Sequence, residues 1–240
     1  MYMRTVKGNP QTSYSERGIT MKKIGAITVG QSPRVDLIPE IQPILGDSIE
    51  IIQAGALDGL SKEEIAKFVP RPGESILVSR LTDGTSAMFG ESYIIPRLQL
   101  CIDNLEKQGV SLILFLCTGE FPAEFRSNVP LIFPDHILKG LIPAIGVKNL
   151  SVIIPAKAQA EQMPEKWKDC CNSLHITPVS PYGDPQAVFE AAKDIPADTD
   201  LILLDCIGYT IEMKERIQAL TQKPVLLSRT LVARVIRELA

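Results

Sequence analysis

The sequence has no long hydrophobic run and no excess of basic residues. Pro, Gly or charged residues interrupt every apolar stretch well before the roughly 18 to 20 residues that cross a bilayer. Lys and Arg total 25 against 28 Asp and Glu, which gives a net charge of −3. A concentrated positive field, which phosphate backbones require, is therefore not indicated. We expect a soluble, cytoplasmic protein that binds neither membranes nor nucleic acid.

The sequence also has little that would hold a metal or build a disulfide framework. It contains only two histidines, His136 and His175, neither beside a cysteine, and no CxxC spacing. The cysteines are odd in number, in a chain long enough to form a core without disulfides. We therefore expect a reducing compartment, no metal and no cofactor. The five cysteines are Cys101, Cys117, Cys170, Cys171 and Cys206.

The order of apolar and polar segments predicts an α/β protein with two lobes. Residues 1–20 are polar and lack periodicity, so we expect a flexible leader. Beyond them, buried strands alternate with helical patterns, which favours mainly parallel sheets. We expect an N-terminal α/β lobe at 21–146, a C-terminal α/β lobe at 147–227, and a C-terminal helix at 228–240 that packs back on the first lobe.

One segment breaks this alternation. Two short apolar runs, at about 76–81 and 85–89, flank Asp83-Gly84, a dipeptide that supplies the positive φ of a tight hairpin turn. The pattern predicts a β-hairpin inserted in the first lobe near 75–89. Its exposed edge could provide a homodimer contact.

An internal repeat is the most informative feature of the sequence. LILFLCTG at 112–119 matches LILLDCIG at 201–208 in Leu, Ile, Leu, Cys and Gly. Both segments end a predicted strand, and in parallel α/β sheets ligands bind beyond the carboxyl ends of strands. If the lobes are related by pseudo-twofold symmetry, Cys117 and Cys206 face each other across a cleft. One thiol could then accept a proton while the other donates one. The alternative is that each is a small buried hydrophobe.

The loops around the two cysteines supply candidate binding groups. Backbone amides and hydroxyls there could hold a carboxylate and stabilise charge developing on it, and Arg34 could act as a charge clamp. Each hydroxyl could instead cap a helix; Ser32, with Pro33 after it, has the pattern of a helix start. Besides Arg34, the predicted substrate-binding residues are Gly30, Gln31, Ser32, Thr118, Gly119, Gly208, Tyr209 and Thr210.

Four segments, LCTGEF, LDCIGYT, ITVGQSPR and LDGLSKEE, make the chain resemble the AroM family across about residues 21–240. That family in turn resembles the aspartate/glutamate racemase-like superfamily, whose members share two pseudo-symmetric α/β lobes and a cleft with paired cysteines. The resemblance implies that Cys117 and Cys206 match the two cysteine positions. In the superfamily these act in racemisation, epimerisation or cis-trans isomerisation, and in malonate decarboxylation where one cysteine is absent.

The sequence departs from glutamate racemases at two places. Those enzymes carry Thr-His after the second cysteine, where this chain has Ile207 and Gly208, and they carry an aspartate after the first strand, where this chain has none. Both departures weaken the case for amino-acid racemisation.

Three hypotheses follow. The first is a cofactor-independent racemase or isomerase that acts on a small carboxylic acid through Cys117 and Cys206. The second is a non-catalytic protein that binds or senses a small carboxylate in the same cleft. The third, a redox dithiol, has little support because the two cysteines are far apart in sequence without CxxC spacing.

Overall fold

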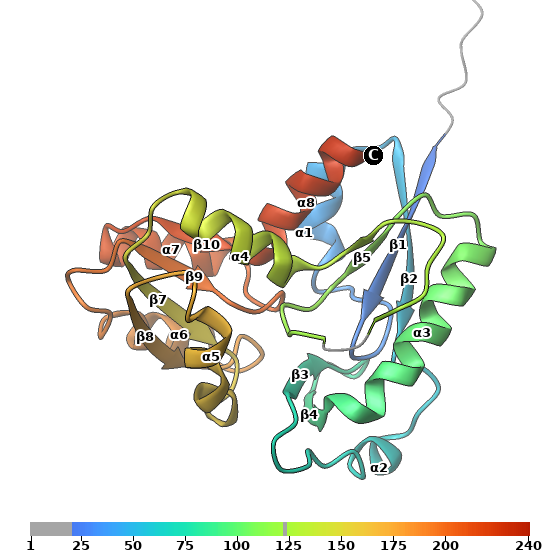
Figure 1. Cartoon of the computed structure of the whole chain (residues 1–240), viewed down its shortest axis with the longest axis horizontal. Helices are drawn as coiled ribbons and strands as arrows, with labels where there is room; N and C mark the ends of the chain where they lie inside the picture. The colour runs from blue at the N-terminus through green and yellow to red at the C-terminus, as the bar shows by residue number, and fades with distance from the viewer. Residues whose placement is uncertain (1–20, 122–123) are drawn as a thin grey trace, which may run out of the picture.

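The computed structural model describes residues 21–121 and 124–240, so the predicted leader at 1–20 lies outside the described residues. Within them the chain forms two four-stranded sheets and a two-stranded hairpin. Figure 1 shows the two sheets side by side, with the hairpin below the first one. The predicted α/β class with mainly parallel sheets is confirmed.

The first sheet has the strand order β2-β1-β5-β6, and every pair in it is parallel. Its strands are β1 (Lys22–Thr28), β2 (Ile49–Gly55), β5 (Ile113–Phe115) and β6 (Leu131–Ile132). The helices of this half are α1 (Ile38–Leu45), α2 (Lys62–Ile65), α3 (Glu91–Lys107) and α4 (Pro134–Ala144).

The second sheet has the order β10-β9-β7-β8 and is also parallel throughout. Its strands are β7 (Asn149–Ile154), β8 (Ser173–Pro178), β9 (Leu201–Leu204) and β10 (Val225–Leu227). The helical segments are η1 (Lys157–Gln162), α5 (Met163–Trp167), α6 (Pro185–Ala192), α7 (Ile211–Thr221) and α8 (Ser228–Leu239).

The two sheets have the same topology. In each, the first strand along the chain lies between the second and the third, and the fourth strand lies outside the third. β5 and β9 occupy equivalent places in this order. One copy of the sequence repeat covers each of these two strands. The pseudo-symmetry inferred from the repeat is therefore a property of the fold.

Each half of the chain contributes one helix that packs against the sheet of the other half. Leu138 and Ile142 of α4 are buried against β7 and β9 of the second sheet, although the predicted boundary at 146 assigns α4 to the first lobe. Reciprocally, Val232 and Ile236 of α8 are buried with Ile41 of α1 against the first sheet, and Figure 1 shows α8 beside α1. Burial of each large aliphatic side chain contributes about 1.5–3 kcal/mol, so this exchange ties the halves together.

The inserted hairpin consists of β3 (Ile76–Arg80) and β4 (Ser86–Gly90), paired antiparallel. Gly84 in its turn has a φ of 88°, as the Asp-Gly pattern predicts. The hairpin packs closely on the loop after β1, because a Cβ on Gly30 would lie 2.3 Å from Ser79 Oγ and 2.5 Å from the Arg80 carbonyl oxygen. Only glycine permits this approach, which places β3 beside the ends of the first sheet.

The helix predicted to begin at Ser32 begins later. α1 starts at Ile38, and the Ser32 N–H and Oγ both donate to the Asp58 carboxylate, at 2.7 and 2.6 Å. The Arg34 N–H donates to Gln53 Oε1 at 2.8 Å. These bonds hold the segment after β1 in a non-helical conformation, which outweighs the local Ser-Pro signal.

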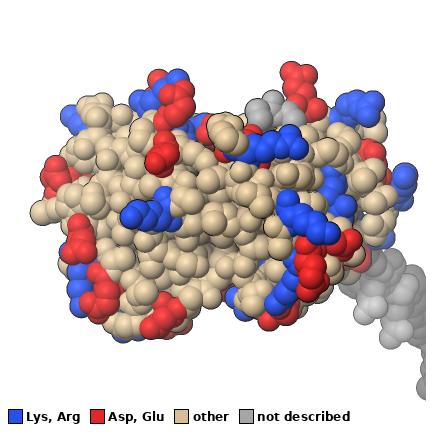
Figure 2. Space-filling view, turned by 90° about the horizontal axis from the view of Figure 1, so that it is seen from below, with Lys and Arg blue, Asp and Glu red and all other residues tan. Residues whose placement is uncertain are grey.

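Both signs of charge are present on the surface. On the face shown in Figure 2, Lys and Arg are interspersed with Asp and Glu around the edge, and much of the middle is uncharged. None of the helices in residues 21–121 and 124–240 combines the length and apolarity that a membrane span needs.

Candidate functional site

Cys117 and Cys206 line the same pocket. Each lies two residues after the last residue of its strand, β5 or β9. Each sulfur also accepts a hydrogen bond of 3.3 Å from the N–H two residues ahead, that of Gly119 or Gly208. The two thiols therefore share one local geometry, repeated from the two halves of the fold.

Burial keeps both thiols protonated in the closed pocket. It raises the pKa of Cys117 to about 12, against the opposing effects of the Gly119 N–H and of Lys166. Burial also raises the pKa of Cys206, where three groups act in the opposite direction: the Gly208 N–H, the Tyr182 hydroxyl and Arg34. A thiolate at Cys206 would therefore have more stabilising partners than one at Cys117.

Arg34 provides a buried cation in this pocket, with its side chain 3% exposed. Its Nε and Nη2 donate to the two oxygens of Asp36, both at 2.8 Å, and its Nη1 lies 3.3 Å from Thr28 Oγ1. Burial acts to lower the pKa of Arg34, but the Asp36 carboxylate, with Tyr182 and Cys206 nearby, raises it. A guanidinium has five N–H groups, so two keep no partner among the described residues, one on each Nη nitrogen.

Tyr182 and residues of the hairpin line the rest of the pocket around the thiols. Leu77 and Ser79 of β3 line the pocket, and the Tyr182 hydroxyl lies 3.8 Å from Cys206 Sγ. A Cβ on Gly208 would approach the Tyr182 ring to 2.6 Å. Glycine is thus needed at position 208 for Tyr182 to reach the sulfur.

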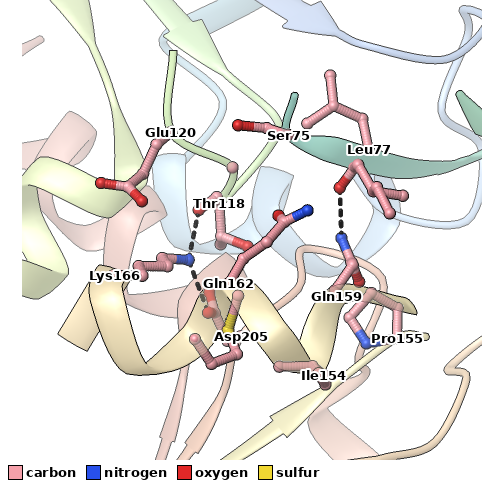
Figure 3. Close-up of a pocket in the computed structure, with 13 residues that line it drawn as sticks. Ser75, Leu77, Thr118, Glu120, Ile154, Pro155, Gln159, Gln162, Lys166 and Asp205 are labelled. Carbon is pink, nitrogen blue, oxygen red and sulfur yellow. Dashed lines mark hydrogen bonds and ion pairs between the residues drawn. The ribbon is translucent and has the colours of Figure 1, made fainter. Parts of the chain in front are cut away.

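A second compartment adjoins the thiol pocket, with Thr118, Gln159 and Asp205 among the shared lining residues. Figure 3 shows Lys166 between Thr118 and Asp205. Its Nζ donates to the Thr118 carbonyl oxygen at 2.8 Å and to Asp205 Oδ2 at 2.6 Å. Gln159 Nε2 donates to the Ile76 carbonyl oxygen at 2.9 Å. Both Lys166 and Gln159 thus bridge the two halves of the molecule.

The two compartments are small. Their volumes are about 30 Å³ beside the thiols and about 40 Å³ beside Lys166. Such cavities accommodate water molecules rather than a metabolite. A larger ligand therefore requires the lining residues of the two halves to move apart.

The profile of the family described as AroM protein matches residues 24–240. The chain belongs to the AroM family. A search of curated proteins found no match.

Solved structures similar to this AroM-family chain include enzymes of the aspartate/glutamate racemase-like group, which confirms the predicted fold. The maleate cis-trans isomerase of Nocardia farcinica is 14% identical with a TM-score of 0.61, over 91% of this chain and 92% of that one. The allantoin racemase of Pseudomonas fluorescens is 16% identical with a TM-score of 0.57, over 90% and 89%. The aspartate racemase of Picrophilus torridus is 15% identical with a TM-score of 0.58, over 90% and 93%.

The structure brings together five of the eleven predicted site residues as pocket lining: Cys117, Cys206, Arg34, Thr118 and Gly119. Gly208 lies next to the pocket, where it donates to the Cys206 sulfur.

The other five predicted residues lie away from the lining of both compartments. Gly30 packs on the hairpin, and the Ser32 hydroxyl donates to Asp58. The Gln31 side chain makes hydrogen bonds to Leu57, Leu60 and Thr82. The Tyr209 hydroxyl donates to the Val179 carbonyl oxygen at 2.7 Å, inside the core. Thr210 is the N-cap of α7 and accepts from the Met213 N–H. In this structure the polar groups of these residues bond within the fold, and their contact with substrate stays a prediction.

Sequence reasoning missed five residues of the site. Asp205 could have been found, since it immediately precedes Cys206 in the repeat. Lys166 and Gln159 lie on short helical segments with no distinctive pattern, and Tyr182 lies in a loop. Arg229 of α8 is fully buried and donates to the Ile207 and Gly208 carbonyl oxygens, at 2.9 and 3.0 Å.

A metal site is not evident in residues 21–121 and 124–240, where no group of three His, Cys, Asp or Glu side chains is placed to hold an ion.

Proposed function

We propose that this AroM-family protein is a cofactor-independent racemase or isomerase that acts on a small carboxylic acid through Cys117 and Cys206. The observation that carries the proposal is the pair of equivalent thiols in one buried pocket that also contains Arg34. The isomerase and racemases that share the fold are consistent with this chemistry.

Arg34 is the proposed carboxylate anchor. Asp36 holds the Nε and Nη2 side of its guanidinium, which leaves the end formed by Nη1 and Nη2 to bind a carboxylate by two parallel hydrogen bonds. Because Arg34 lies in the thiol pocket, a carboxylate bound there presents its neighbouring carbon to the sulfurs.

The two thiols have complementary proposed roles. Cys206 first loses its thiol proton to solvent, and Gly208, Tyr182 and Arg34 stabilise the thiolate. This thiolate then removes the proton from the carbon next to the carboxylate. The negative charge that develops passes to the carboxylate, where Arg34 stabilises it. Cys117, whose pKa of about 12 keeps it protonated, then donates its proton to the opposite face of that carbon. The configuration inverts, and the reverse reaction exchanges the roles.

Exchange of carbon-bound hydrogen for deuterium tests this function. Candidate acids are incubated with the protein in D2O, and the proton signal next to the carboxylate is followed by NMR. Proton abstraction predicts enzyme-dependent loss of that signal. Absence of exchange across a broad panel of acids that bind would contradict proton transfer.

A binding or sensor protein is the second candidate. The observation that favours it is the burial of both thiols, which raises the pKa of each and leaves the closed pocket without a free base at neutral pH. A sensor predicts carboxylate binding that survives both Cys117→Ser and Cys206→Ser, with no deuterium exchange by the unmodified protein.

A further inference from the structure

Two buried acceptor atoms beside the thiol pocket have no hydrogen-bond partner in the part of the chain that the structure describes: Asp205 Oδ1 and Gln159 Oε1. Asp205 is 4% exposed, and both residues line both compartments. A buried polar atom without a partner costs free energy, about 1–3 kcal/mol. At a cleft, such atoms are available to accept a hydrogen bond from a ligand that binds there.

The lysine and the amide nitrogen beside these acceptors are already engaged. Lys166 Nζ bonds to Asp205 Oδ2 and the Thr118 carbonyl oxygen, and it lies 4.9 Å from the centre of the Trp167 ring. The amide nitrogen of Gln159 bonds to the Ile76 carbonyl oxygen, which directs its Oε1 to act as acceptor. This end of the cleft therefore offers acceptors, whereas the Arg34 end offers donors.

The groove outside this compartment is lined mainly by acidic side chains. It shares Ser75, Ile76, Glu120 and Gln162 with the Lys166 compartment. Its lining contains four glutamates and one arginine, namely Glu74, Glu120, Glu161, Glu165 and Arg71. Lys139 and Lys168 pair with two of the glutamates. The approach thus favours a cationic group over a second carboxylate.

We infer that Asp205 Oδ1 and Gln159 Oε1 form a subsite for a nitrogen-bearing group of the substrate. The ligand is a small carboxylic acid that also carries an N–H donor, preferably an ammonium group. This inference rests on the proposed function in one respect, that Arg34 binds the carboxylate. It excludes simple dicarboxylates as preferred ligands, because a second carboxylate would face two acceptors.

Binding of matched acids tests the subsite without requiring turnover. Dissociation constants are measured by titration calorimetry for three pairs: β-alanine and propionate, 4-aminobutyrate and butyrate, aspartate and succinate. We expect the amino member of at least one pair to bind 10-fold or more tightly than its partner. If no amino acid of the panel binds, or if none binds more tightly than its partner, the inference is overturned.

Substitutions in the subsite test whether it causes the tighter binding of the amino acids. Gln159→Leu is expected to reduce the preference at least 3-fold with little change for the acid that lacks nitrogen, and Asp205→Asn to reduce it further. Gln186→Leu, the same change on the surface of α6, should leave it unaltered. Gln159→Leu keeps the test decisive if Asp205→Asn does not fold. A preference that every folded subsite variant retains overturns the inference.

The outcomes separate this inference from the proposed function. Preferred binding of amino acids without deuterium exchange supports the subsite and contradicts proton transfer by the two thiols. Exchange of succinate or propionate without any preference for nitrogen supports the isomerase and contradicts the subsite.

Discussion

Arg229 Nη2 donates a hydrogen bond of 3.0 Å to the carbonyl oxygen of Gly208. Arg229 belongs to α8, which packs on the first sheet, whereas Gly208 follows β9 of the second sheet and bonds to the Cys206 sulfur. The same guanidinium pairs with Glu40 at 2.7 Å. The exchanged C-terminal helix therefore holds the loop of one thiol against the half that carries the other.

Arg229→Met should be strongly destabilising. It leaves the Ile207 and Gly208 carbonyl oxygens without their donor and Glu40 without its partner. Loss of one partner of a buried ion pair costs about 3–5 kcal/mol, measurable by denaturant unfolding. Arg234→Met on the exposed side of the same helix should change the free energy of unfolding by less than about 0.5 kcal/mol. Equal effects of the two substitutions would contradict the proposed role of Arg229.

Arg34→Gln should weaken carboxylate binding. A hydrogen bond to a charged group contributes about 1.5–3 kcal/mol, so the dissociation constant should rise about 10- to 150-fold. Arg34→Lys should restore little of the affinity, because the ammonium lacks the planar fork that binds a carboxylate bidentately. Titration calorimetry with an acid that the unmodified protein binds provides the measurement. Unchanged affinity in Arg34→Gln would exclude Arg34 as the anchor.

Alkylation of Cys117 should depend steeply on pH. Burial raises its pKa to about 12, and only the thiolate reacts. Because an ordinary thiol has a pKa of about 8.5, the rate at pH 8 should be on the order of a thousandfold lower than in the unfolded chain. The rate in the folded protein should then rise about tenfold per pH unit from pH 8 to 11, as the thiolate fraction grows. Mass spectrometry of the Cys117 peptide after iodoacetamide treatment measures both rates. A plateau below pH 9 would show that the thiolate is stabilised instead.

Gly208→Ala should disturb the Cys206 loop. The added Cβ would meet the Tyr182 ring at 2.6 Å, so either Tyr182 or the N–H that bonds to Cys206 must move. We expect at least a 10-fold loss of deuterium exchange, with destabilisation of about 1–3 kcal/mol from overpacking. Gly140→Ala is the matched control, because a Cβ there meets nothing within 4 Å in α4. Its effect on stability should be neutral or favourable by up to about 1 kcal/mol. Full exchange activity in Gly208→Ala would contradict the requirement for glycine.

The sequence predicted the features that depend on local patterns. Continuous apolar runs located the strands, Asp83-Gly84 located the hairpin, and the repeat around Cys117 and Cys206 gave the equivalent strands β5 and β9. These features follow from side-chain periodicity and turn chemistry over a few neighbouring residues.

The sequence did not predict most side-chain contacts between distant segments. Ser32 has a helix-cap pattern, but its N–H and hydroxyl donate to Asp58 instead. Thr210, which has no such pattern with its neighbours, does cap a helix. Lys166 pairs with Asp205 across 39 positions of sequence, and no local pattern specifies such a pair. The packing of α4 on the second sheet is likewise set by contacts between whole elements rather than by any one segment.

The central claim is that Cys117 and Cys206 act together on one bound acid. Its most direct test is the rate of deuterium exchange next to the carboxylate, measured by NMR in D2O for the unmodified protein, Cys117→Ser, Cys206→Ser and Cys101→Ser. Cys101 is a buried thiol of α3 that lines neither compartment. The account predicts that Cys101→Ser keeps the exchange rate, that Cys206→Ser abolishes exchange of the enantiomer whose proton faces Cys206, and that Cys117→Ser abolishes exchange of the other. Exchange of both enantiomers that survives loss of either thiol would contradict it.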